Sequence, residues 1–187
     1  MKTNQENTHV CPWWLAYTFD NPLRRLIHNP AKILAGLVKD GDAVLDLGCG
    51  MGYFSIGMAR LVGDSGRVIS VDLQAEMLDR VRTRAEQQNL ISRIQLHQCQ
   101  PDRIGLSEPV DFALAFWMVH EVPNRRSFLA EVRNLLKPEA RFLVVEPKLH
   151  VSAADLQHTV ELAGSVGLHP LAKPKVGISR SVLFAPN

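Results

Sequence analysis

VLDLGCGMGYFS, residues 44–55, is an apolar run that passes into three glycines at alternate positions. Its first half predicts a buried strand, and the periodicity of the residues that follow predicts a helix. A strand–turn–helix unit of this kind presents free N–H groups and the positive end of the helix dipole to a ligand. The absent side chains at Gly48, Gly50 and Gly52 let the ligand approach the main chain. The turn is therefore predicted to bind a negative group, either a carboxylate or a phosphate.

Two common nucleotide motifs do not fit this turn. The dinucleotide fingerprint G-x-G-x-x-G needs a third glycine where Tyr53 stands. The phosphate-binding motif G-x-x-x-x-G-K-[ST] is also missing, which gives nucleoside triphosphates no support. A dehydrogenase stays an alternative that NADH binding would test, and Tyr53 argues against it.

Two acidic residues narrow the choice of ligand. Asp46 lies just before the first glycine, and Asp72 closes the next apolar run. A carboxylate at the end of the second strand can accept hydrogen bonds from both hydroxyls of a ribose. Asp46 would favour a cationic amino group nearby, directly or through water. A ligand with a ribose, a carboxylate and an ammonium group is an amino-acid-bearing nucleoside, which describes S-adenosylmethionine.

The rest of the chain alternates short β-rich runs with helical ones, as in a parallel sheet covered by helices. The predicted strands are 43–48, 67–72, 93–98, 110–116 and 141–146, and the predicted helices are 53–62, 75–88 and 125–136. Ser152 and Asp155 resemble a capping box, which predicts a further helix through about Val166. Residues 167–175 and 178–186 are predicted strands joined by a short link that suits an antiparallel hairpin.

Composition limits the class of protein. A chain of 187 residues with 46% hydrophobic content suits one domain with a substantial core. Its 21 basic and 19 acidic residues give a net charge of +2, too little for a broad field directed at a nucleic acid. Cys11, Cys49 and Cys99 form no C-x-x-C pair, so we expect reduced thiols, no disulfide framework and no metal site. Without an export signal or a long apolar run, we expect a cytoplasmic monomer or homodimer with no membrane partner.

Four segments in order resemble the class I S-adenosylmethionine-dependent methyltransferases, specifically the small type 11 or UbiE-like group. The segments are VLDLGCGMG (44–52), VISVDLQAEML (68–78), VDFALAFWMVHEVP (110–123) and LLKPEARFLVVEP (135–147). The resemblance implies an α/β Rossmann-like three-layer sandwich whose seven-stranded, mostly parallel sheet has an antiparallel last strand. It divides the chain into an N-terminal lid or helical segment, 1–29, and a cofactor-binding methyltransferase domain, 30–187.

The resemblance also implies cofactor-binding residues: Asp46, Gly48, Cys49, Gly50, Gly52, Tyr53, Asp72, Leu73, Gln100 and Phe116. Asp46 and the glycines would form the methionine pocket, and Asp72 would clamp the ribose. Leu73 would lie beside the adenine, and the main chain near Phe116 would contact the methionine end.

One position departs from the pattern of this family. Many relatives place an aspartate after the third strand, where it accepts the adenine amino group, whereas Gln100 stands there in this chain. Its amide oxygen can accept the same hydrogen bond without a charge. Asp102 takes that role if the register differs by two residues.

The resemblance implies in-line transfer of a methyl group to a small-molecule acceptor, in which positioning can supply on the order of 7–11 kcal/mol of the barrier. A hydroxyl or ammonium acceptor also benefits from a general base. His120 lies in the segment predicted to face the pocket, and Glu121 and Glu146 are further candidates. The alternative for His120 is a helix-capping or packing role.

Residues 11–30 place aromatic side chains ahead of arginines. They could form a lid in which aromatic faces line the acceptor pocket and arginines bind a carboxylate or phosphate. They could equally form an amphipathic helix that covers one sheet edge with its arginines solvated. The substrate-binding candidates are Trp14, Tyr17, Arg24, Arg25 and Trp117.

Other functions stay open at this point. Methylation of a macromolecule, RNA or protein, is one alternative, although no appended nucleic-acid-binding module is visible and no nucleic-acid partner is expected. A sensor or partner protein that binds S-adenosylmethionine without transferring its methyl group is another. Arg80, Arg82 and Arg84 alternate along a predicted helix and are expected to form a solvated face.

Overall fold

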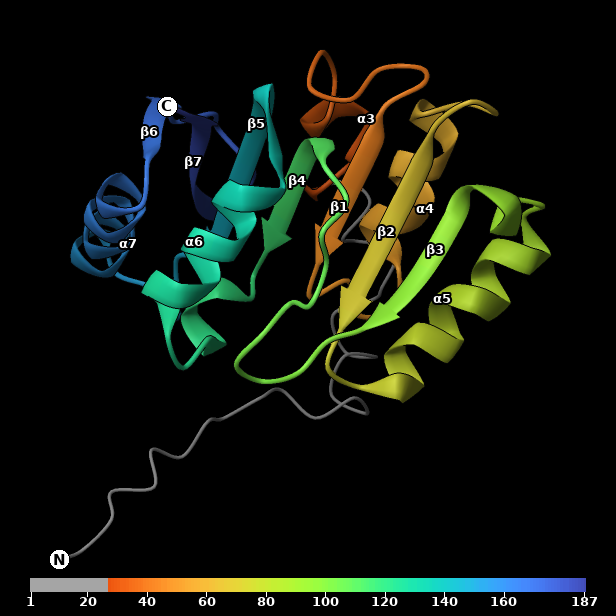
Figure 1. Cartoon of the computed structure of the whole chain (residues 1–187), viewed down its shortest axis with the longest axis horizontal. Helices are drawn as coiled ribbons and strands as arrows, with labels where there is room; N and C mark the ends of the chain where they lie inside the picture. Colours follow the sequence, from red (N-terminus) through yellow and green to blue (C-terminus); the bar gives the residue numbers. More distant parts are fainter. Residues whose placement is uncertain (1–26) are drawn as a thin grey trace, which may run out of the picture.

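The computed structural model describes residues 27–187 and shows one sheet with helices on both faces (Figure 1). The candidate residues Trp14, Tyr17, Arg24 and Arg25 lie outside the described residues, as does nearly all of the predicted segment 1–29. The seven strands are β1 (Ala43–Leu47), β2 (Arg67–Asp72), β3 (Ile94–Gln98), β4 (Val110–Phe116), β5 (Leu136–Pro147), β6 (Leu168–Ala172) and β7 (Ser179–Pro186).

The strands are ordered β3-β2-β1-β4-β5-β7-β6. Strands β1 to β5 pair in parallel, and β7 is antiparallel to both β5 and β6. The predicted seven-stranded, mostly parallel sheet with an antiparallel last strand is confirmed.

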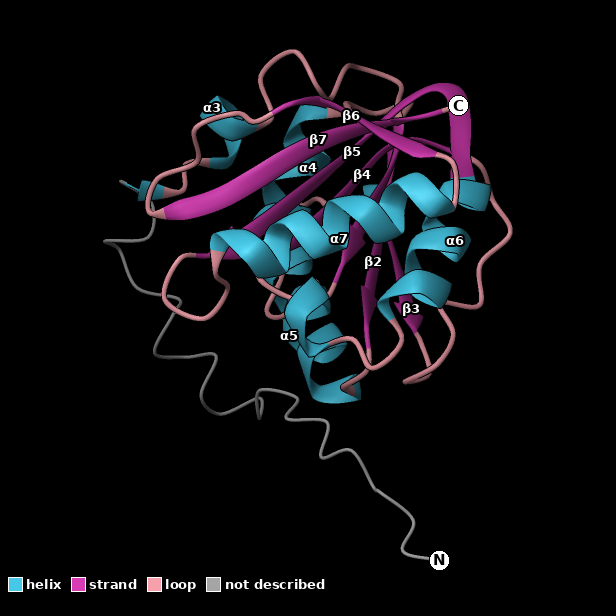
Figure 2. Cartoon of the chain, turned by 90° about the vertical axis from the view of Figure 1, so that its left-hand side faces the viewer, coloured by secondary structure: helices cyan, strands magenta, loops and turns pink. Residues whose placement is uncertain are grey.

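Helices cover both faces of the sheet. The helices are α3 (Pro30–Ile33), α4 (Tyr53–Leu61), α5 (Ala75–Gln87), α6 (Arg125–Leu135) and α7 (Ala153–Ser165), with short 3₁₀ turns η2 (Ile91–Arg93) and η3 (Val119–Glu121). Buried residues of α4 and α5 share one core cluster, and those of α6 and α7 share the other. Helix α7 packs against β6 and β7 at one end of the sheet (Figure 1 and Figure 2). Its predicted capping box is confirmed by reciprocal hydrogen bonds between Ser152 and Asp155.

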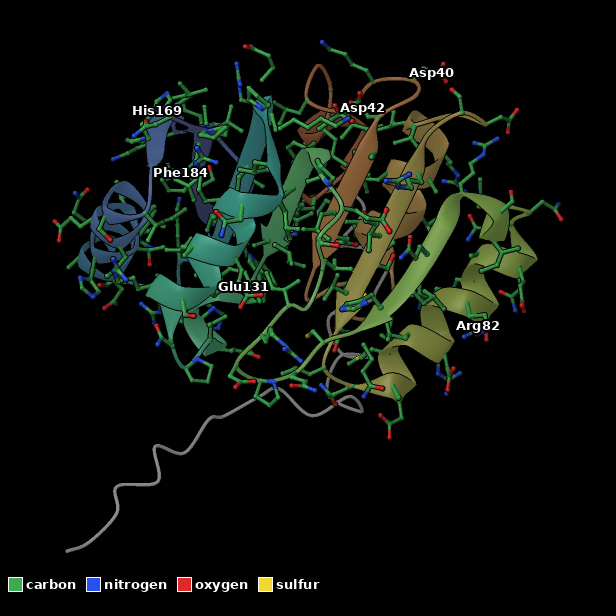
Figure 3. The ribbon with its side chains drawn as sticks, viewed as in Figure 1. Asp40, Asp42, Arg82, Glu131, His169 and Phe184 are labelled. Carbon is green, nitrogen blue, oxygen red and sulfur yellow. The ribbon has the colours of Figure 1, made fainter. Side chains whose placement is uncertain are left out.

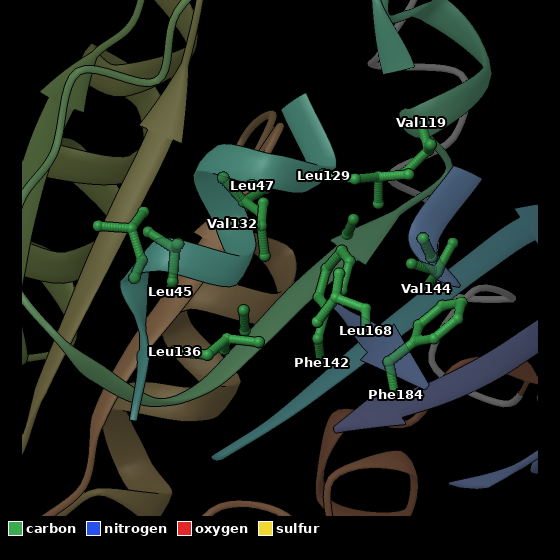
Figure 4. Packing of buried hydrophobic residues seen from close by; sticks show 14 of the residues in the cluster. Leu45, Leu47, Val119, Leu129, Val132, Leu136, Phe142, Val144, Leu168 and Phe184 are labelled. Atoms are coloured by element: carbon green, nitrogen blue, oxygen red, sulfur yellow. The ribbon is translucent and has the colours of Figure 1, made fainter. Parts of the chain in front are cut away.

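The alternation of side chains along each strand divides the core between the two faces. Leu45 and Leu47 of β1 enter the cluster under α6 and α7, whereas Val44 enters the cluster under α4 and α5. Phe142 and Phe184 stack in the cluster under α6 and α7, with ring centroids 6.0 Å apart (Figure 4). Both faces of the central strands are therefore buried, which explains their nearly continuous apolar sequence.

Strand β5 begins at Leu136, directly after α6, so the predicted start at 141 is wrong. Leu136 pairs with Val110 of β4, and the register then shifts before Phe112. The Lys137 ammonium also bonds both carboxylate oxygens of Asp111 in β4, at 2.7 and 2.8 Å. These contacts with the neighbouring strand hold the segment extended.

The predicted two-residue link between the last strands is also wrong. Strand β6 ends at Ala172, and residues 173–178 connect it to β7. The register shifts between Pro170 and Ala172, and the Ser181 hydroxyl bonds to the Pro174 carbonyl. Pro170 and Pro174 have no N–H to continue a strand ladder, so the chain leaves the sheet after Ala172 and forms a wider connection to β7.

Candidate active site

The carboxyl ends of the parallel strands meet at one edge of the sheet, which is where ligands bind in open α/β folds. This is the lower edge in Figure 1, where the strand arrows end. Asp40 and Asp42 lie near the opposite edge (Figure 3). The glycine turn after β1, Asp72 at the end of β2 and the loop after β4 all belong to the carboxyl edge.

The three glycines of the turn meet different surroundings, although all have positive φ. A Cβ on Gly48 would lie 2.9 Å from the Cβ and Cγ of Met118, and one on Gly52 would lie 3.0 Å from Val81. A Cβ on Gly50 would meet no atom of residues 27–187 within 4 Å. Close packing therefore requires glycine at the outer two positions, whereas Gly50 opens onto free space.

Asp72 is fixed against the same turn. Its Oδ2 accepts the Gly50 N–H at 2.9 Å, and its Oδ1 accepts the Gln74 N–H at 3.0 Å. Burial, the largest influence, raises the pKa of Asp72, while hydrogen bonds from Gln74, Gly50 and Leu73 oppose it. Each oxygen has a further lone pair, so the carboxylate can accept hydrogen bonds from a diol while it holds the turn. Leu73 follows directly, where the resemblance places the adenine.

Asp46 lies behind the turn and is only 2% exposed. Its Oδ2 accepts the Ser55 hydroxyl of α4 at 2.5 Å. Cys49, in the turn itself, is also buried, and burial followed by the charges of Asp46 and Asp72 raises the pKa of its thiol well above the usual value. Cys49 is a neutral, space-filling residue here, and Tyr53 begins α4 immediately after the turn.

Two contacts at the candidate cofactor site, one of them at the turn, cannot be predicted from the sequence. The Arg84 guanidinium of α5 donates to the Met51 carbonyl at 3.0 Å, so the expectation that Arg84 belongs to a solvated face is wrong. Neighbouring Arg82 does point into solvent (Figure 3). The Gln98 amide donates to the Leu73 carbonyl at 3.0 Å. Both residues hold main-chain atoms of the candidate cofactor site, and nothing in their local sequence signals this role.

The adenine side of the site follows β3. Gln100 is exposed and forms an isolated antiparallel bridge with Arg103, with its N–H 2.9 Å from the Arg103 carbonyl. Asp102 is exposed in the turn between them. Cys99 is free and half-buried, and burial followed by the charge of Asp72 raises the pKa of its thiol to about 11.

The loop after β4 begins with an unusual backbone at Trp117, whose φ of +62° is rare for a bulky residue. Its N–H donates to the Val145 carbonyl at 2.7 Å, and its indole Nε1–H donates to the Ser179 hydroxyl at 3.0 Å. Buried His28 packs edge-on against its ring with centroids 5.1 Å apart. The side chain of Phe116, the last residue of β4, turns into the core against Phe54.

His120, further along this loop, forms a close pair with Glu146 near the end of β5. His120 Nδ1 lies 2.6 Å from Glu146 Oε2, and the His120 backbone N–H donates to Glu146 Oε1 at 3.2 Å. Glu146, at the end of β5, is 2% exposed, whereas His120 is partly exposed. Glu121 is more distant, with its Oε1 3.9 Å from His120 Nε2.

Burial is the largest single influence on the pKa of His120 and lowers it. The hydrogen bond and charge of Glu146, with the charge of Glu121, outweigh burial, and the pKa of His120 is raised from 6.5 although Arg125 opposes this. A histidine whose Nδ1–H is held by a carboxylate presents Nε2 as a proton acceptor.

Among residues 27–187 there is no group of three or more histidine, cysteine, aspartate or glutamate side chains able to hold a metal ion. None of the helices in that range has the length and apolarity needed to cross a membrane.

A family model described as a methyltransferase domain matches residues 38–167. The chain belongs to this methyltransferase family. The demethylmenaquinone methyltransferase of Lactobacillus johnsonii is 34% identical over 110 residues, which cover 58% of this chain and 45% of that protein. The UbiE ubiquinone/menaquinone biosynthesis C-methyltransferase of Cellvibrio japonicus is 33% identical over 115 residues, covering 61% of this chain and 46% of that protein. The matches thus span about half the length of these curated relatives.

Solved structures show the same fold. An S-adenosylmethionine-dependent methyltransferase from Aquifex aeolicus superposes with a TM-score of 0.84 at 22% identity, covering 94% of this chain and 99% of that one. The [4+2]-cyclase SpnF superposes with a TM-score of 0.66 at 17% identity, covering 78% of this chain and 59% of that one. The predicted class of methyltransferase is confirmed, while a cyclase among the neighbours shows that this fold alone does not specify a reaction.

S-adenosylmethionine is the cofactor that the family implies, and the residues of the turn fit it. Gly50 borders open space beside a helix N-terminus, which suits a carboxylate. Asp72 supplies acceptors for a ribose diol, and the buried carboxylate of Asp46 gives the pocket a negative charge to match an ammonium group.

Proposed function

We propose that this chain binds S-adenosylmethionine at the glycine turn and transfers its methyl group to a small molecule, with His120 as general base. The observation that carries the proposal is the hydrogen bond between Asp72 and the glycine turn. The Asp72 carboxylate accepts the N–H of Gly50 at 2.9 Å, and Gly50 faces open space. When bound, S-adenosylmethionine supplies an electrophilic methyl group on a positively charged sulfur.

The residues of the turn would bind and orient this cofactor. The positive end of the α4 dipole and the backbone of the glycine turn would hold its carboxylate, and Asp72 would accept hydrogen bonds from its ribose. Leu73, fixed through its carbonyl by Gln98, would lie against the adenine. Gln100 or Asp102 would accept the adenine amino group, since both are exposed after β3.

His120 would take the proton that a hydroxyl or ammonium acceptor loses on methylation. Glu146 would accept the Nδ1–H, which leaves the lone pair on Nε2 for the acceptor, and would stabilise the imidazolium that forms. Glu146 therefore acts through His120 as a positioning residue. Trp117, held by Ser179, would line the acceptor side of the same loop.

A small-molecule acceptor is supported by the names of the relatives. Besides the menaquinone and ubiquinone enzymes, a 2-phytyl-1,4-naphtoquinone methyltransferase from Synechococcus elongatus is 32% identical over 111 residues, covering 58% of this chain and 47% of that protein. The net charge of +2 gives no broad field for RNA.

The first test is calorimetric titration of the full chain with S-adenosylmethionine and S-adenosylhomocysteine. We expect micromolar binding of both, lost in Asp72→Asn and retained in Asp79→Asn, whose carboxylate lies on the exposed face of α5. No binding to the wild-type chain would contradict the proposal.

The second test uses methyl-labelled S-adenosylmethionine with a cell extract divided by a size filter. Label transferred to the small-molecule fraction, and lost in His120→Asn, is the expected result. Label transferred to RNA or protein would identify a macromolecular acceptor instead. Binding without S-adenosylhomocysteine formation in any fraction would indicate a sensor or partner protein.

A further inference from the structure

A pocket that contains no residue of the glycine turn lies between α7 and the connection from β6 to β7. Its volume is about 290 Å³. Leu156 and Val160 of α7 form an apolar wall together with Pro174 of the connection. The methyl-transfer proposal does not use this pocket.

Three cationic side chains also line it: Lys173, Lys175 and Arg180. In the described part of the chain, none of the ion pairs involves any of the three. The Arg180 guanidinium is held in place from one side, because its Nη1 donates to the carbonyls of Val151 and Lys148 at 3.0 and 3.3 Å. Positive charge without a carboxylate partner therefore borders an apolar wall.

Neighbouring acidic groups are engaged elsewhere. The Asp155 carboxylate accepts both the backbone N–H and the hydroxyl of Ser152 in the cap of α7. Glu146, opposite Arg180 in the β5–β7 register, is bound to His120. Neither forms an ion pair with the three cations.

We propose that this pocket binds a small amphiphilic anion, a carboxylate or phosphate monoester with an apolar body. The apolar body packs against Leu156, Val160 and Pro174, as most ligand pockets are largely apolar with a few fixed polar groups. The anionic group lies among Lys173, Lys175 and Arg180 and is bound by charge-assisted hydrogen bonds. A neutral compound with the same body lacks the second contribution and binds more weakly.

The wall of the pocket is shared with the candidate active site through Ser179, which also accepts the indole N–H of Trp117 at 3.0 Å. An occupant thus lies beside the residue that holds the loop after β4. The binding site itself does not depend on methyl transfer.

The test uses two dyes with the same aromatic body, 8-anilinonaphthalene-1-sulfonate and the uncharged N-phenyl-1-naphthylamine, titrated into the full chain by fluorescence. In Lys173→Glu/Lys175→Glu we expect the Kd of the sulfonate dye to rise at least tenfold and that of the neutral dye to change less than twofold. Lys32→Glu/Lys39→Glu makes the same charge change at exposed lysines elsewhere and should leave both values unchanged.

Val160→Trp places a larger side chain in the pocket beside its apolar wall and should weaken the binding of both dyes. Octanoate or octyl phosphate should displace the sulfonate dye, and octanol should not. The proposal would be overturned if the sulfonate dye bound Lys173→Glu/Lys175→Glu with unchanged affinity, or if the lysine control weakened its binding equally. Unchanged binding of both dyes to Val160→Trp would also overturn it. Circular dichroism and Tm verify folding of each variant. Because S-adenosylmethionine binding is measured separately with Asp72→Asn, failure of one proposal leaves the other intact.

Discussion

Gly48 and Gly50 share a left-handed backbone but face different neighbours, so alanine at each should have a different effect. Alanine at Gly48 meets Met118 at 2.9 Å and forces the loop after β4 to move. Alanine at Gly50 meets no described residue within 4 Å and costs backbone strain of roughly 1–2 kcal/mol, but its methyl group enters the proposed ligand space. We expect Gly48→Ala to lower Tm more than Gly50→Ala does. We expect Gly50→Ala to weaken S-adenosylmethionine binding although its Tm falls less.

Thermal melts and calorimetry of both variants check this expectation. If Gly50→Ala lowered Tm as much as Gly48→Ala and bound the cofactor normally, the open space at Gly50 would have no role in binding.

The His120–Glu146 pair predicts a pH dependence of the reaction. Only neutral His120 can accept a proton, and its pKa is raised from 6.5, so kcat should fall as the pH drops below that raised value. Glu146→Gln removes the charge that raises the pKa, so the acid limb of the profile should move to lower pH. His120→Asn should remove the limb and most of kcat. An acid limb that stays in place in Glu146→Gln would show that another group titrates.

The same pair makes a prediction for stability that does not require an acceptor. A histidine whose pKa is higher in the folded state stabilises the protein below its unfolded pKa, and this stabilisation is lost as the pH rises through the folded pKa. The difference in free energy of unfolding between wild type and His120→Asn should therefore be larger at pH 5.5 than at pH 9, values chosen at about 1 unit below and well above the ordinary histidine pKa. Urea denaturation at the two pH values measures it.

At the scale of elements, α6 follows the His120 loop directly and begins with a side-chain cap. Asn124 Oδ1 accepts the Ser127 N–H at 3.0 Å, while the first turn carries two arginines, which the helix dipole disfavours. Asn124→Ala should cost about 1 kcal/mol of the free energy of unfolding. Asn124→Asp keeps the acceptor and adds a favourable charge, so it should be at least as stable as wild type. An Asn124→Ala variant as stable as wild type would show that the cap contributes nothing.

The strand bounds show which features of the fold can be predicted from local sequence. Short, nearly continuous apolar runs place β1, β2 and β4 within a residue of their observed bounds, because both faces of these strands are buried. The start of β5 depends instead on pairing of Leu136 with Val110 and on the Lys137–Asp111 ion pair. Such contacts join segments distant in sequence, so no local pattern contains them.

At the scale of the whole molecule, the cofactor should stabilise the fold by mass action. A ligand at 100 times its Kd that binds only the folded state adds about 2.7 kcal/mol. For a chain of this size each kcal/mol raises Tm by about 2–4 °C, so saturating S-adenosylhomocysteine should raise Tm by about 5–11 °C. Differential scanning fluorimetry measures the shift, which Asp72→Asn should abolish. The same shift in Asp72→Asn would place the binding site elsewhere.

The resemblance of four segments to a known family implied the sheet with its antiparallel last strand. The residues alone indicated the α/β class and the candidate cofactor turn. These depend on local features: apolar periodicity, glycines where side chains are excluded, and acidic residues at strand ends. Only the tertiary structure joined His120 to Glu146, 26 residues away, and Arg84 to Met51, 33 residues away. It also formed the cationic pocket beside α7. The reason is physical: strand register and helix packing bring these side chains together, and neither can be read from spacing along the chain.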